Sequence, residues 1–136
     1  MFGKNAGGSP QNSIDSLIGV GTRIEGNVFF SGGLRVDGEV CGNISSENPR
    51  EGTVVISEKA SVEGRITVGH VVINGTVIGP VIAEGSLELL PSARVTGDVE
   101  YNQIEMQQGS VIQGQMVHKL NSNDKTTVEL KLASNS

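Results

Sequence analysis

The segment ASVEGRITV (residues 60–68) places alanine, valine, glycine or isoleucine at every second position and polar residues between them. Alternate side chains of a β-strand point to opposite faces, so this segment has one apolar face and one polar face. The segment ARVTGDVEY (residues 93–101) alternates in the same way. Since no segment shows a sustained helical period, the sequence predicts an all-β protein.

Both segments contain the pattern apolar-x-Gly-x-apolar, which recurs through residues 20–118. Neighbouring copies lie about 10 to 12 residues apart or are separated by larger steps, and such self-similarity is typical of stacked repeats. Each central glycine has the inward phase. We therefore expect these glycines inside the stack, where a missing side chain leaves room for large neighbours in the next repeat. The predicted core glycines are Gly26, Gly38, Gly64, Gly75, Gly85, Gly97 and Gly114.

Each alternating repeat unit is only about five residues long, which is short for a sandwich strand, and two-residue hairpin turns are mostly missing. The sequence therefore favours a β-solenoid over a sandwich. Three faces of five to six residues give coils of roughly 16 to 18 residues, so about six coils fit the repeat region. Each buried Val, Ile or Leu stabilises such a core by about 1.5–3 kcal/mol. The core therefore does not depend on aromatic residues, of which the chain has three Phe, one Tyr and no Trp.

The composition argues against several classes of protein. The formal net charge is −5 and the pI is about 4.9, whereas nucleic-acid binders carry basic stripes. The single cysteine, Cys41, cannot form an internal disulfide and fits a reducing compartment. No apolar run approaches the roughly 20 residues that span a bilayer, and the start lacks the apolar region of a secretory signal. We therefore expect a cytoplasmic protein that binds no nucleic acid.

The chain divides into three parts. Residues 1–19 are rich in Gly, Asn and Ser and predict a flexible arm, residues 20–118 carry the repeats, and residues 119–136 form a polar tail. Neither flank predicts a capping helix, so both end coils would expose strand edges that can pair with another chain. We expect the protein to polymerise end to end, through like or unlike ends. The predicted interface residues are Ile24, Val28, Phe29, Phe30, Ile112, Met116 and Val117.

The segments GLRVDGEVCGNI (residues 33–44) and VVINGTVIG (residues 71–79) carry a likeness to a known family. They resemble the bactofilins, polymer-forming bacterial cytoskeletal proteins, and the likeness covers about residues 20–118. The resemblance implies a right-handed triangular parallel β-helix with disordered tails, which polymerises without a nucleotide or other cofactor. It also implies a scaffold for cell shape and the envelope, with peptidoglycan hydrolases or synthases as partners.

The opening Met1-Phe2-Gly3-Lys4 resembles the membrane-targeting start of many bactofilins. An apolar pair next to a base can dock weakly on anionic lipid, because each basic residue near the surface contributes about 1 kcal/mol. A polymer multiplies such weak contacts. The resemblance thus implies that Met1, Phe2 and Lys4 bind lipid and that the filament lies on the inner face of the cytoplasmic membrane.

Two other classes compete with this interpretation. A left-handed β-helix enzyme, such as a hexapeptide-repeat acyltransferase, has a strict six-residue repeat and catalytic or metal-binding histidines, and a zinc site of that kind needs three. This chain has only His70 and His118, which we expect at solvated turns. Cys41 has the outward phase and no neighbouring histidine, so we predict no catalytic, cofactor-binding or metal-binding residue. The other alternative is a solenoid adaptor that does not polymerise.

Overall fold

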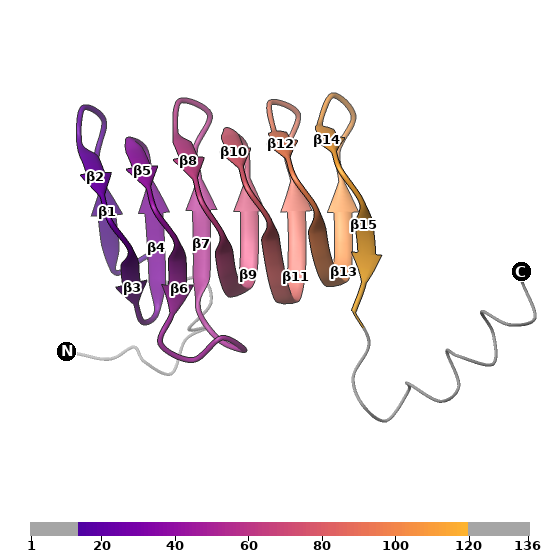
Figure 1. Cartoon of the computed structure of the whole chain (residues 1–136), viewed down its shortest axis with the longest axis horizontal. Coiled ribbons are helices and arrows are strands. Elements are labelled where there is room, and N and C mark those ends of the chain that lie inside the picture. Colours follow the sequence, from indigo (N-terminus) through magenta and orange to yellow (C-terminus); the bar gives the residue numbers. More distant parts are fainter. Residues whose placement is uncertain (1–13, 120–136) are drawn as a thin grey trace, which may run out of the picture.

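The computed structural model describes residues 14–119, and this part of the chain consists of strands, turns and no helix (Figure 1). All strand pairs are parallel, so the chain winds in coils instead of folding back in hairpins. The strands are β1 (Ser16–Ile18), β2 (Arg23–Glu25), β3 (Val28–Phe30), β4 (Gly33–Val36), β5 (Glu39–Cys41), β6 (Ile44–Ser46), β7 (Thr53–Ile56), β8 (Ser61–Glu63), β9 (Ile66–Ile73), β10 (Thr76–Ile78), β11 (Val81–Leu89), β12 (Arg94–Thr96), β13 (Val99–Met106), β14 (Val111–Gln113) and β15 (Met116–His118).

Each coil has three faces, and strands at the same place in successive coils pair side by side. β2, β5, β8, β10, β12 and β14 form a six-stranded sheet on one face. The other nine strands form a sheet that covers the remaining two faces, because β9, β11 and β13 each turn a corner into the next coil. Register partners are from 15 residues apart (Val62 and Val77) to 22 residues apart (Val40 and Val62). These features confirm the predicted β-solenoid of about six coils.

Aliphatic side chains form a continuous column behind each face of the solenoid. On the face of the six-stranded sheet, Val40, Val62, Val77 and Val95 lie in register, and each is almost completely buried. The columns behind the other two faces contain Ile and Leu as well as Val. Residues that alternate with them, such as Glu63, point outward and are exposed. The aliphatic core predicted from the alternation is therefore present.

The solenoid begins earlier in the chain than the sequence analysis predicts. β1 starts at Ser16, inside the segment assigned to a flexible arm, and it pairs with β4. The segment around β1 lacks the apolar-x-Gly-x-apolar pattern, which is why the sequence gives no sign of this strand. The predicted membrane-binding residues Met1, Phe2 and Lys4 lie outside the described residues.

The predicted core glycines lie at the corners of the coils and not among the side chains of the interior, so this prediction was wrong. A Cβ at Gly38 would lie 2.3 Å from the carbonyl oxygen of Thr22, and one at Gly75 would lie 2.2 Å from that of Ser57. The closest neighbours of these two positions are backbone atoms of the preceding coil. All seven predicted glycines occupy bends between strands or within β11: Gly26, Gly38, Gly64, Gly75, Gly85, Gly97 and Gly114.

One kind of corner repeats in every coil and forms what we call the glycine ladder. It follows each strand of the six-stranded sheet and consists of Gly26, Gly42, Gly64, Gly79, Gly97 and Gly114, all with φ between +137° and +157°. From the second rung on, an added Cβ would lie 2.0–2.6 Å from the carbonyl oxygen of the preceding ladder glycine. Only glycine therefore lets the coils approach closely enough to hydrogen-bond here, as Gly64 N does to Ile78 O at 2.9 Å.

We predict that Gly64→Ala destabilises the protein more than Gly26→Ala. Both positions have a positive φ, but a Cβ would meet a carbonyl oxygen at 2.0 Å at Gly64 and nothing within 4 Å at Gly26. Chemical denaturation followed by circular dichroism should show a loss of about 1–3 kcal/mol for Gly26→Ala from backbone strain alone, and a clearly larger loss for Gly64→Ala. Equal losses would mean that the ladder corners do not limit coil stacking.

Candidate assembly surfaces

The solenoid has two open ends, which lie at opposite ends of its long axis (Figure 1). β1, β2 and β3 form the first coil, and each pairs with one strand only among those the structure describes. The second half of β13 forms the last coil with β14 and β15, and the pairing there is also one-sided. Each end thus presents backbone N–H and C=O groups in strand geometry, which favours pairing with further strands.

At the first end, the apolar side chains of the strands that have the inward phase are buried or half-buried. Ile24 and Val28 have the inward phase and are half-buried, and Phe30 is 9% exposed and belongs to the core together with Ile18. Phe29 alternates with these residues, so its side chain points outward and is 74% exposed. Three of the predicted interface residues therefore face the core at this end, and Phe29 lies on the outer surface.

Two apolar side chains of the last end have the inward phase and are well exposed. Met106 and Met116 have the inward phase, because their register partners Leu89 and Val99 are fully buried. Both methionines are nevertheless 43% exposed, since no further described coil covers them. Ile112 also has the inward phase and is half-buried. The last coil thus has the side-chain pattern of an interior coil, but it is packed against another described coil on one side only.

Val117 has almost the same exposure, 44%, but faces outward beside its register partner Glu100. Five of the seven predicted interface residues therefore have the inward phase at an end of the solenoid, and the two others, Phe29 and Val117, lie on its outer surface. Ile104 and Met106 also have the inward phase in the last coil, but they were not among the predicted interface residues. Their alternation with the polar residues Gln103 and Glu105 was the sequence signal that could have found them.

His118 is exposed, as expected, but it belongs to the last strand and not to a turn, so that part of the prediction was wrong. Its ring stacks on Tyr101 of the preceding coil, with centroids 5.7 Å apart and an interplanar angle of 28°. Its Nε2 lies 2.8 Å from the carbonyl oxygen of Asn102, which can only accept, so Nε2 carries the hydrogen. This ring pair lies at the end of β15, where it connects the last coil to the preceding one.

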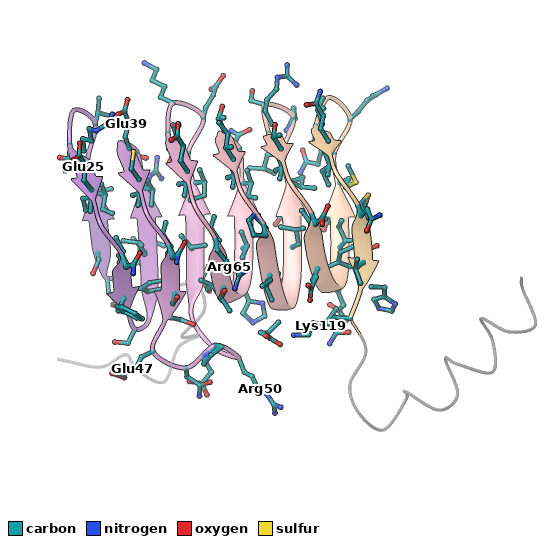
Figure 2. The ribbon with its side chains drawn as sticks, in the orientation of Figure 1. Glu25, Glu39, Glu47, Arg50, Arg65 and Lys119 are labelled. Carbon is teal, nitrogen blue, oxygen red and sulfur yellow. The ribbon has the colours of Figure 1, made fainter. Side chains whose placement is uncertain are left out.

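An ion pair fixes the end of β15 to the side of the solenoid. Lys119 Nζ lies 3.0 and 2.9 Å from the two carboxylate oxygens of Glu84 in β11, and both side chains are partly buried. Figure 2 shows Lys119 beside the lower corner of the coils and not across the open end. The last described residue is therefore anchored at the side of the coils, and none of residues 14–119 pairs with the outer edge of the last coil.

Charged side chains form a small network beside the first end. The Arg23 side chain lies 3.0 Å from that of Glu25 in β2 and 3.0 Å from that of Glu39 in the paired strand β5. Figure 2 shows the two glutamates near each other at the first end. The hydrogen bond to Glu25 raises the pKa of the Arg23 guanidinium above its ordinary value. All three side chains are well exposed, so they contribute little to stability. The network carries one positive and two negative charges beside the edge where a further coil would meet β2.

Two further residues with reactive side chains, Cys41 and His70, lie in strands of different sheets. Cys41 is half-buried and faces outward from β5. His70 lies at the corner of β9 as expected, but it is half-buried, and its Nδ1 is 2.8 Å from Ser86 Oγ. Within residues 14–119, no group of three or more His, Cys, Asp and Glu side chains is placed to hold a metal ion. The same residues include no helix with the length and apolar character needed to cross a bilayer.

Parallel coils around an aliphatic core, with two open ends, place residues 14–119 among the β-solenoids. A family model described as bactofilin, polymer-forming cytoskeletal, matches residues 16–117. The chain therefore belongs to the bactofilin family, and its role is that of a structural cytoskeletal protein. The match begins where β1 begins. A search of curated proteins and a search of solved structures found no match.

We predict that Glu84→Gln loosens the last coil by removing the ion pair with Lys119. A partly exposed pair contributes at most about 1 kcal/mol, so the amides of β15 should exchange hydrogen up to about fivefold faster. Mass spectrometry of hydrogen exchange measures this rate, and the amides of β5 should not change. Glu88→Gln is the control, because Glu88 lies in the same strand without an ion pair to any residue of the range 14–119. Equal exchange rates in the two variants would contradict the anchoring role.

Proposed function

We propose that the protein assembles end to end into filaments that need no nucleotide. The observation that carries the proposal is the one-sided pairing of the first and last coils, together with the exposed inward-phase methionines of the last coil. A second copy placed on an end would supply the strand edges and side chains that an interior coil receives from its neighbour. The description of the family as polymer-forming supports the proposal.

The contact between two molecules would repeat the contact between two interior coils. Full burial of an aliphatic or methionine side chain contributes about 1.5–3 kcal/mol, and the half-exposed Met106, Met116 and Ile112 would gain part of this. Backbone groups on three strand edges would gain hydrogen bonds as well. Two such contacts per subunit produce an open polymer, without polarity if like ends meet and with polarity if unlike ends meet. Both arrangements bury the last coil.

The filaments are further proposed to lie on the inner face of the cytoplasmic membrane and to scaffold envelope proteins, such as peptidoglycan hydrolases or synthases. The support for membrane binding is the likeness of Met1-Phe2-Gly3-Lys4 to the membrane-targeting start of bactofilins. Filament assembly would place many copies of this weak lipid-binding segment side by side. The support for envelope partners is the family membership.

We predict that Met116→Arg abolishes filaments and that Val117→Arg does not. The two residues are neighbours in β15 and are 43% and 44% exposed, but Met116 faces the next molecule and Val117 faces solvent. An arginine at residue 116 would place a charge in the end contact, where desolvation costs several kcal/mol. Electron microscopy and sedimentation of the purified proteins measure the outcome.

Circular dichroism must show that both variants keep the β-fold, since an unfolded variant would not test the contact. The expected Met116→Arg protein is a soluble monomer, or a dimer joined through its first end. Filaments of normal length from Met116→Arg would refute the proposed end contact. Loss of filaments in Val117→Arg alone would place the contact on the outer surface of the solenoid.

Deletion of residues 1–8 tests membrane binding separately from assembly. We predict that the shortened protein still forms filaments, because the deleted residues precede the first strand, but no longer sediments with liposomes that contain anionic lipid. Unchanged sedimentation with these liposomes would show that Met1, Phe2 and Lys4 do not bind the membrane. A Lys4→Gln variant with intermediate sedimentation would assign part of the binding to the charge.

A further inference from the structure

The corner between β6 and β7 contains residues 47–52, whereas the other corners along this edge have only one or two residues. Hydrogen bonds hold it in place. The Ser46 hydroxyl donates to the carbonyl oxygen of Asn48 at 2.7 Å, and the amide of Arg50 donates to the Asn48 side chain at 3.1 Å. Figure 2 shows this corner protruding from the solenoid, with Arg50 at its outer side.

Beside the corner lies an open notch of about 450 Å³, lined by Phe29, Phe30, Ser31, Ser46 and Glu47. Within residues 14–119, Phe29 is the only aromatic side chain that is largely exposed. The Glu47 carboxylate forms no ion pair with another residue of that range. An exposed ring next to an unpaired carboxylate suits a ligand in which an apolar side chain is followed closely by a cation.

The chain itself contains a segment with this chemistry. Lys4 is the only charged residue among residues 1–13, and it follows the apolar Met1 and Phe2. Its single positive charge complements the carboxylate of the notch, and the two apolar side chains complement the aromatic ring. A tethered segment also binds at an effective concentration on the order of millimolar, so a weak contact can be well occupied.

The described part of the chain begins close to the notch. The amide of Asp15 donates to the carbonyl oxygen of Gly33 at 2.9 Å, and the Asp15 carboxylate accepts from the amide of Gly33 at 3.0 Å. Gly33 is two residues from Ser31 in the wall of the notch. From Lys4 to Asp15 the chain can span up to about 36 Å when extended, so the segment can reach the notch of its own molecule.

We propose that Met1–Lys4 docks in this notch of its own chain, with Phe2 against Phe29 and Lys4 against Glu47. The same side chains are the ones proposed to bind lipid. Docking therefore holds them against the protein until an anionic membrane competes for them. The inference goes beyond the proposed function and does not depend on filament assembly.

The first test uses the full chain with Phe2→Trp, which introduces the only tryptophan. Docking predicts that acrylamide quenches its fluorescence less than in a peptide of residues 1–13, and that Phe29→Ser removes this protection. Val117→Ser is the matched control, because Val117 is an exposed, outward-facing residue at the opposite end, and it should keep the protection. Quenching equal to that of the peptide, or protection that survives Phe29→Ser, would overturn the proposal.

Carbodiimide crosslinking of the full chain identifies the charged partner. The expected main product joins Lys4 to Glu47, and in a mixture of ¹⁴N- and ¹⁵N-labelled protein both halves should come from one chain. Glu47→Lys should remove the tryptophan protection, and Lys4→Glu combined with Glu47→Lys should restore it. A lysine joined mainly to carboxylates outside the corner, or mainly to a second chain, would overturn docking in its own notch.

Discussion

Direct contact between the backbones of consecutive coils is the constraint on which the rest of the structure depends. Along three faces each coil hydrogen-bonds to the next, and at the ladder corners a Cβ would fall 2.0–2.6 Å from the preceding carbonyl oxygen. A side chain there would hold the coils apart and break the hydrogen bonds on both sides of the corner. The glycine ladder thus permits the coil spacing, and this spacing brings the aliphatic columns together. The packing of the aliphatic core therefore depends on the ladder glycines, although these residues contribute no side chain to it.

The same contact connects folding with assembly. An interior coil is covered on both sides, whereas the last coil is covered on one side and leaves Met106 and Met116 partly exposed. Proteins usually block such an edge with a cap or with charge. Here the ion pair between Lys119 and Glu84 fixes the end of β15 at the side of the coils, and no strand among the described residues covers the edge. In the proposed filament, the end coils of two molecules stack on each other in the same way as two consecutive coils stack within one molecule.

The alternation and the number of coils could be predicted from the sequence, because side-chain phase is a local property. The roles of the glycines could not. Gly38 and Gly64 share one sequence pattern, but Gly38 lies at the corner before a strand of the six-stranded sheet and Gly64 at the corner after one. The backbone atoms that each glycine contacts belong to the preceding coil, and the local pattern does not specify them. The pattern also fits Gly42 and Gly79, which complete the ladder with one glycine per coil. At the ends, the phase of Phe29 was readable, but its place beside a corner formed by residues 47–52 depends on pairing between coils.

Diffraction from aligned filaments tests most directly whether one solenoid continues the next. If the rods stack end to end, the strands cross the filament, and the coil spacing gives a reflection at about 4.8 Å along the filament axis. Six coils at this spacing correspond to about 29 Å of filament per subunit. A 4.8 Å reflection perpendicular to the filament axis would mean that the rods lie across the filament, and it would contradict assembly through the open ends.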